Sequence, residues 1–170
     1  MHLNNSPFAD YLFEFCQETL VLFMRKLSCL FLLPLLLLFG CAKDQNTKDD
    51  EILRKYISDN HLNAVAEPNG LYYVETQAGT GGSPTVSSTV FVNYKGYYTN
   101  GVVFDQTSGT PAQLILANMI GGWQEGIPLM KKGGKATLLV PSLLGYGAAG
   151  YNGIPGGTVL IFDIELVNFQ

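Results

Sequence analysis

An alternation of period two runs through the stretch Leu160-Ile161-Phe162-Asp163-Ile164-Glu165-Leu166, in which every even-numbered residue is apolar. Successive side chains of a β-strand point to opposite faces, so these apolar residues share one face while Asp163 and Glu165 point to solvent. The same period recurs at residues 90–95 and 136–140. Three half-buried strands are therefore predicted.

Turn signals lie between these segments. Asn100-Gly101 predicts a hairpin, because both residues tolerate a positive φ, and Lys132-Gly133-Gly134 predicts a second antiparallel connection. With the remaining β-rich segments, we expect an antiparallel sheet of five to six short strands.

Only one segment after residue 69 has helical spacing. Its apolar residues fall on one helical face, and Pro128 must end or distort the helix; these residues are Ile120, Trp123, Ile127 and Met130. One helix and a sheet this small predict an α+β domain in which the helix covers one face of the sheet.

The N-terminal part has a different composition. Leu30 to Phe39 reads LFLLPLLLLF, about ten apolar residues, which is too short to cross a membrane and typical of a signal-peptide core. Arg25 and Lys26 precede it and Cys41 follows it. This order resembles a bacterial lipoprotein signal, which implies a lipid on Cys41; a plain cleaved signal and an uncleaved anchor are the alternatives.

The expected organisation has four parts. Residues 1–23 are acidic where a leader is basic, so we interpret them as a mis-assigned extension before a start at Met24. The signal peptide is 24–41, a polar linker with a short helix at 52–62 is 42–68, and the folded domain is 69–170. Asp49 or Asp50 is the expected N-cap of that helix.

Export has two consequences for the predicted mature chain. Cys16 and Cys29 lie in the removed part, so Cys41 is left without a disulfide partner. The expected location is the cell envelope, with the chain lipid-anchored to a bacterial membrane, in our interpretation the outer membrane, on its periplasmic or surface side.

Several function classes are excluded by what the chain lacks. A formal net charge of −4 offers no basic surplus for nucleic acid. The predicted mature chain has one histidine, His61, which lies in the linker region, so a nucleophilic triad cannot be assembled in the domain, and the lack of His and Cys there argues against a zinc site. Gly145 to Gly150 matches the G-x-G-x-x-G pattern, yet the loop residues that follow it exclude the helix that a dinucleotide site needs.

Five motifs then occur in order over residues 71–169, and together they resemble the FKBP-type peptidyl-prolyl cis-trans isomerases. They are Val92-Asn-Tyr94-Lys-Gly96, Asn100-Gly-Val-Val-Phe104-Asp105, Ile120-Gly-Gly-Trp123-Gln-Glu-Gly126-Ile-Pro-Leu-Met130, Val140-Pro-Ser-Leu-Leu-Gly-Tyr146-Gly147, and Ile154-Pro155 followed by Leu160-Ile-Phe162-Asp-Ile-Glu-Leu166. The resemblance implies a curved antiparallel sheet wrapped on one short helix, with an apolar pocket between them.

Matched position by position, the family's motifs imply a set of site residues. Trp123 is the implied floor of the pocket, Asp105 and Tyr146 are polar groups at its edge, and the Ile120 backbone N–H is a donor to a substrate carbonyl. The catalytic residues implied are Tyr94, Phe104, Asp105, Tyr146 and Phe162, and the substrate-binding residues are Leu114, Met119, Ile120 and Trp123.

This chain departs from the family's best-known members near the site. Its loop Gln106–Thr110 is shorter and lacks an Arg, Ala112 and Leu114 stand at aromatic positions, and Gly156 replaces a second Pro. These changes predict a wider pocket and weaker catalysis.

Two functions remain open. One is a peptidyl-prolyl isomerase acting on proline-containing chains of exported proteins; the other is a weakly active or inactive module of the same fold that binds chains as a chaperone. The resemblance implies no cofactor and possible binding of macrolides of the tacrolimus type. We expect a monomer, because residues 52–62 are too short for the dimerising arm of some members.

Overall fold

A computed structural model describes residues 45–170, which belong to one compact unit. A helix covers 45–59. The elements after it are β1 (Val65–Ala66), β2 (Tyr72–Gln77), β3 (Thr89–Tyr97), β4 (Val103–Gln106), β5 (Ala112–Ile115), η1 (Leu116–Asn118), α2 (Gly121–Gly126), η2 (Ile127–Leu129), β6 (Lys135–Val140), η3 (Ser142–Leu144) and β7 (Leu160–Phe169).

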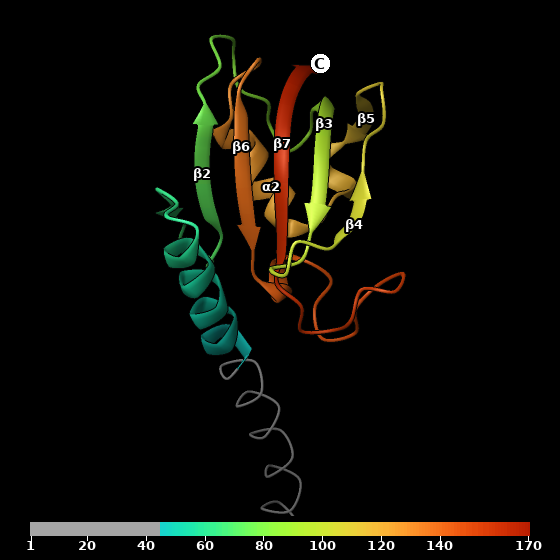
Figure 1. Ribbon diagram of the computed structural model, residues 1–170. Coiled ribbons are helices and arrows are strands. Elements are labelled where there is room, and N and C mark those ends of the chain that lie inside the picture. The colour runs from blue at the N-terminus through green and yellow to red at the C-terminus, as the bar shows by residue number, and fades with distance from the viewer. Residues whose placement is uncertain (1–44) are drawn as a thin grey trace, which may run out of the picture. The chain divides into compact units, whose positions relative to one another are not determined.

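All strand pairs in the seven-stranded sheet are antiparallel, in the order β1-β2-β6-β7-β3-β4, and β5 also pairs with β3. The last strand in sequence, β7, therefore lies in the middle of the sheet, between β6 and β3 (Figure 1). The predicted antiparallel sheet packed on a short helix is confirmed. The sheet has seven strands instead of five to six, because β1 is an additional short strand and β4 and β5 pair with β3 as two separate strands.

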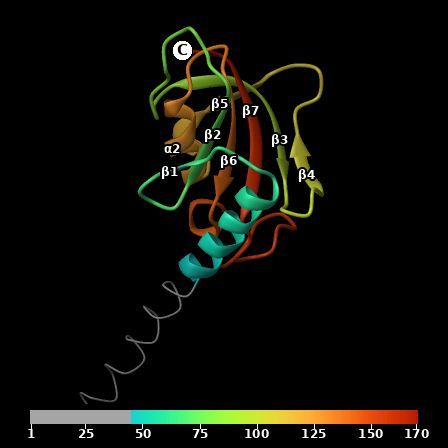
Figure 2. The same cartoon turned by 60° about the vertical axis from the view of Figure 1, so that its left-hand side comes forward.

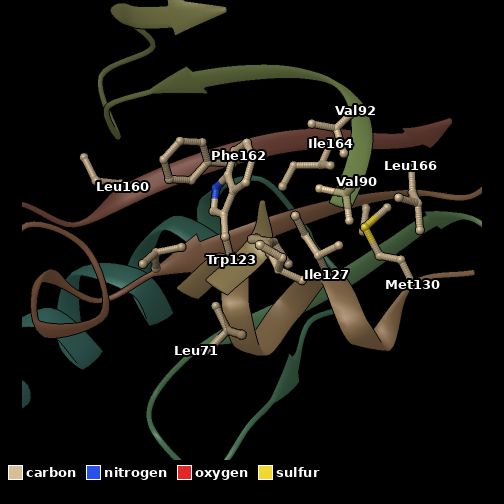
Figure 3. Close-up of a cluster of buried hydrophobic side chains, with 14 of the residues drawn as sticks. Leu71, Val90, Val92, Trp123, Ile127, Met130, Leu160, Phe162, Ile164 and Leu166 are labelled. Atoms are coloured by element: carbon tan, nitrogen blue, oxygen red, sulfur yellow. The ribbon is translucent and has the colours of Figure 1, made fainter. Parts of the chain in front are cut away.

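The inner face of the sheet packs against α2, and β3 and β7 curve over this helix (Figure 2). Glycines permit the close approach: a Cβ at Gly122 would lie 2.5 Å from the Val140 side chain, and one at Gly126 would lie 2.6 Å from that of Leu138. Pro128 lies in η2, directly after α2, as predicted. The buried residues of this core, several of which Figure 3 draws, are Leu71, Val90, Val92, Leu116, Trp123, Ile127, Met130, Ala136, Leu138, Val140, Ile154, Leu160, Phe162, Ile164 and Leu166.

The outer face carries a second helix, residues 45–59, over β2 and β6. Leu53 is fully buried there with Tyr72, Val74, Leu139 and Val159. The sequence predicts a folded domain that begins at residue 69, but the compact unit also includes the helix 45–59. The buried Leu53 joins this helix to the sheet.

The helix also begins earlier than the predicted 52–62, so Asp49 and Asp50 lie inside it and neither is its N-cap. Their carboxylates bond to other parts of the fold instead. The Tyr72 hydroxyl donates to Asp50 Oδ1 at 2.6 Å, and Asp49 is fully buried.

Of the two predicted turns, one differs in its role. Asn100-Gly101 joins β3 to β4, with Gly101 at φ 85°, as predicted. Lys132-Gly133-Gly134 follows η2 and leads into β6, so it connects a helical turn to a strand and is not a strand-to-strand connection. Its Gly133 has φ 83°.

The expectations for the start at Met24, the signal at 24–41 and the lipid on Cys41 concern residues outside the described range. Within residues 45–170, no helix combines the length and the apolar character that a membrane crossing needs.

Candidate functional site

Four aromatic rings meet where β3, β4 and β7 pass over α2. Trp123 rises from α2 and lies against Phe162 of β7 (Figure 3), with ring centroids 5.4 Å apart and planes at 86°. Tyr94 contacts Trp123 edge to face at 5.1 Å, and Phe104 contacts Phe162 at 5.6 Å. Edge-to-face pairs of this kind stabilise a fixed arrangement beyond the area they bury. The result is a rigid aromatic cluster.

Exposure differs across this cluster. Trp123 and Phe162 are each only 4% exposed, whereas Tyr94 and Phe104 are half-buried. The Trp123 indole N–H is buried and has no hydrogen-bond partner among the described residues. The cluster therefore has a buried base and partly open sides.

Gly96 of β3 makes room for two of the rings. A Cβ there would lie 2.7 Å from the Phe104 ring and 2.9 Å from the Phe162 ring, which is closer than real side chains approach. Any larger residue would push these rings out of contact. Gly96 lies in a quoted motif, but its role is a close approach between strands that only the structure reveals.

One short hydrogen bond links the cluster to a carboxylate. The Tyr94 hydroxyl donates to Asp105 Oδ2 at 2.6 Å. Burial, followed by this bond to Asp105, raises the pKa of Tyr94 well above its usual range. Tyr94 is therefore neutral at physiological pH, and its proton is engaged with Asp105.

Tyr146 follows η3 and packs on the edge of the aromatic core. Its ring stacks on that of Tyr151, with centroids 5.2 Å apart and planes at 19°. Burial raises the pKa of Tyr146, and the nearby charge of Asp105 adds to the shift. No hydrogen bond holds its hydroxyl within residues 45–170, so this neutral O–H can donate to a ligand.

A backbone donor stands at the start of α2. The Gln124 side chain donates from Nε2 to the Met119 carbonyl at 2.7 Å, which fixes the Met119–Ile120 peptide. In a trans peptide the N–H points opposite to the C=O, so the Ile120 N–H is directed away from Gln124. No acceptor takes this N–H within the described residues.

The structure brings all nine sequence-predicted site residues together. Trp123 and Phe162 belong to the inner core, Asp105 is joined to it through Tyr94, and the others pack against it: Tyr94, Phe104, Leu114, Met119, Ile120 and Tyr146. Their roles stay predictions. Sequence reasoning missed Tyr98, whose ring lies 5.1 Å from that of Phe104, and Tyr151; both are aromatic residues in or beside glycine-containing loops, which is the only signal for them.

No group of three or more metal-binding side chains occurs among residues 45–170. The chemistry available is therefore an apolar aromatic surface with a few hydrogen-bonding groups: the Tyr146 hydroxyl, the Ile120 N–H and the Asp105 carboxylate. These groups belong to an α+β domain in which a curved antiparallel sheet packs on a short helix.

Comparison with known proteins gives the family. Residues 81–167 match the family described as FKBP-type peptidyl-prolyl cis-trans isomerase. The chain belongs to this family.

Named relatives agree with the match. The chain is 40% identical over 131 residues to the FKBP-type peptidyl-prolyl cis-trans isomerase FkpA of Escherichia coli strain K12, covering 76% of this chain and 48% of the relative. It is 44% identical over 105 residues to the peptidyl-prolyl cis-trans isomerase Mip of Coxiella burnetii, covering 60% and 46%. The chain thus spans about half the length of these relatives.

A solved structure shares the fold. The crystal structure of FkpA from Escherichia coli matches with a TM-score of 0.67 and 33% sequence identity, covering 99% of this chain and 74% of that one.

Proposed function

We propose that this protein is a peptidyl-prolyl cis-trans isomerase that binds the proline ring and the residue before it on the aromatic cluster. The observation that carries the proposal is the set of edge-to-face contacts that holds Trp123 beneath Tyr94 and Phe162. Family membership supports it. Apolar rings fixed in this way can accept a proline and exclude water without rearrangement.

The reaction needs no nucleophile. Resonance makes rotation about the prolyl C–N bond cost about 18–20 kcal/mol, so uncatalysed exchange takes tens to hundreds of seconds. The planar amide is more charge-separated than the twisted one, so water stabilises the planar form more. Moving the amide onto a dry aromatic surface removes that preference, and the twisted state is bound better than either isomer.

Polar groups would hold the substrate backbone while the bond rotates. The Tyr146 hydroxyl and the Ile120 N–H are both donors, suited to two carbonyl groups of the peptide. Asp105 orients Tyr94 by accepting a hydrogen bond from its hydroxyl at 2.6 Å. No proton leaves any residue in this scheme.

The test is the cis-to-trans rate of a proline peptide with an apolar residue before the proline. Wild-type chain is compared with a Tyr146→Phe, Asp105→Ala double variant, and urea unfolding of both verifies that they are folded. We expect acceleration by the wild type, a decrease of at least about tenfold in kcat/KM for the variant, and inhibition by tacrolimus.

The second candidate is a chain-binding module with little turnover, favoured by Ala112 and Leu114, which stand where the family resemblance implies aromatic residues. A folded wild type that binds the peptide without accelerating it would replace the isomerase proposal with this one.

We also propose that the protein works in the bacterial cell envelope, attached through a lipid on Cys41. The apolar core at 30–39 between basic residues and this cysteine supports the proposal. Mass spectrometry of the membrane fraction should find the lipid on the N-terminal cysteine, and Cys41→Ala should move the protein out of that fraction. An unmodified Cys41 in the mature protein would overturn the proposal.

A further inference from the structure

A carboxylate on the outer helix contacts the loop that carries Tyr146. Asp49 is fully buried, and its Oδ2 accepts the Ser142 backbone N–H at 2.7 Å. Its Oδ1 accepts the Gln45 side chain, also at 2.7 Å. Ser142 is the first residue of η3, which leads directly to Tyr146. Asp49 therefore joins the helix 45–59 to the segment before a proposed site residue.

Ser142 in turn determines the backbone around Tyr146. Its carbonyl accepts the N–H of Gly145 at 3.1 Å and the N–H of Gly147 at 2.8 Å. These two glycines flank Tyr146 on either side. Because Ser142 N–H is bound to Asp49 and its carbonyl to both glycines, a shift of Ser142 moves the Tyr146 backbone with it.

The far end of the same loop is held by the same helix. Gln45 Nε2 donates to the Gly157 carbonyl at 3.2 Å, and the Gly157 N–H donates to the Gly147 carbonyl at 2.9 Å. Gln45 and Asp49 thus bind both ends of the loop 142–157.

A buried carboxylate is costly unless it is hydrogen-bonded. Among the described residues Asp49 takes part in no ion pair, and its carboxylate accepts hydrogen bonds from the Gln45 amide and the Ser142 N–H. Bonds to an ionised acceptor are shorter and stronger than neutral ones. This arrangement specifies the position of Ser142 more strictly than an apolar contact would.

We propose that Asp49 is a positioning residue for the isomerase site: by binding the Ser142 N–H from the outer face of the sheet, it sets the position of the Tyr146 hydroxyl on the inner face. The effect on catalysis rests on the proposed function, whereas the effect on the loop does not. The helix 45–59 is then part of the catalytic unit, although it contributes no group to the aromatic cluster.

The experiment compares Asp49→Ala, Asp49→Asn and Leu53→Ala in the full chain. Leu53 is buried on the same helix, in a hydrophobic cluster that includes no residue of the loop 142–157, so its variant is the control for a helix that is merely destabilised. Two quantities are measured: hydrogen exchange of the Gly145 and Gly147 amides, and the kcat/KM for the proline peptide.

Asp49→Ala should speed exchange at both amides by about tenfold or more, the change that loss of one charge-assisted hydrogen bond implies. It should lower kcat by a similar factor with little change in KM. Asp49→Asn keeps an acceptor oxygen, so its amide exchange rates and its kcat should lie close to those of the wild type. Leu53→Ala should leave the two amides and the kcat of the folded protein at wild-type values.

Equal exchange at Gly145 and Gly147 in Asp49→Ala and wild type would overturn the proposal, as would a Leu53→Ala variant that reproduces the effect. If Asp49→Ala does not fold, Gln45→Ala serves in its place, because it removes one donor to Asp49 together with the bond to Gly157. If the wild type shows no isomerase activity, the proposed function fails, and the exchange rates alone still decide the role of Asp49.

Discussion

The two faces of the sheet differ in how their residues are held. On the inner face, Phe162 and Ile164 of β7 are buried against the aromatic cluster and α2. On the outer face of the same strand, Asp163 accepts the Thr137 hydroxyl at 2.8 Å and Glu165 accepts the Asn93 amide at 2.9 Å. Neighbouring residues of one strand thus belong to a closely packed core and to a solvated polar network.

This difference shows where the order of each face comes from. The inner face gains its order from the ring contacts of Trp123 and Phe162 with their aromatic neighbours. The outer face is covered over β2 and β6 by the helix 45–59, and on β7 and β3 it carries the polar residues Asp163, Glu165 and Asn93. Substitutions on the two faces should therefore separate loss of function from loss of stability.

The largest effect is expected on the inner face. Phe162→Ala removes a ring that contacts both Trp123 and Phe104, and it should lower the free energy of unfolding by about 3–5 kcal/mol. The activity of the remaining folded protein should also fall, because the aromatic cluster loses one of its four rings. Urea unfolding and kcat/KM, measured on the same preparation, test both; full activity in the folded fraction would contradict the assignment.

An outer-face substitution of similar severity should behave differently. Leu53→Ala deletes a fully buried side chain and should cost about 2–5 kcal/mol of unfolding free energy. Leu53 lies on the opposite face from the aromatic rings, so kcat/KM per folded molecule should equal that of the wild type. A matching loss of activity would contradict this expectation and, with it, the specific role proposed for Asp49.

Alkaline pH should affect both faces in the same direction. Burial, as the largest cause, raises the pKa of Tyr94 and Tyr146 on the inner face and of Tyr72 and Tyr97 on the outer one. In the unfolded chain these groups ionise near pH 10. The contribution of these protonated tyrosines to the free energy of unfolding is therefore complete below about pH 10. It is lost as the pH rises further towards the pKa values of the folded state.

Urea unfolding at a series of pH values from about 8 to 11 measures this loss. Up to about pH 10 the kcat/KM of the folded protein should stay level, since Tyr146 remains protonated. Unfolding free energy that increased with alkaline pH would contradict the expected direction.

The smallest effect is expected for the outer ion pairs. Lys95 Nζ lies 3.6 Å from Asp163 Oδ2 and 4.9 Å from the centre of the Tyr97 ring, and its side chain is 48% exposed. Exposed pairs contribute about 0–1 kcal/mol. Lys95→Ala should therefore shift the urea midpoint only slightly and leave activity unchanged; a shift as large as that of Leu53→Ala would be unexpected.

Local pattern was enough to predict the parts of the fold that depend on it. The alternation at 160–166 gave β7 and its buried face, and the spacing of Trp123 and Ile127 gave α2 on the inner side of the sheet. The quoted motifs also named residues that the structure brings together. In each case the signal lay within a few residues of the position that it described.

Long-range contacts were not predictable in the same way. Asp49 looked like an N-cap, because the partner that stabilises it, the Ser142 N–H, is 93 residues away. The composition of its helix indicates a linker, since the leucine that attaches the helix to the sheet is one residue in a polar sequence. Gly96 and Tyr151 act through contacts between loops or strands, and local composition carries no information about these.

The central place of β7 has a consequence for how the protein folds. Its neighbours β6 and β3 both precede it in sequence, and neither pairs with the other. Until Leu160–Phe169 is available, β3 and β6 belong to separate, incomplete sheets with open edges. Contacts of such long sequence separation make folding slow. A chain whose final strand has not yet been synthesised therefore cannot form the complete sheet.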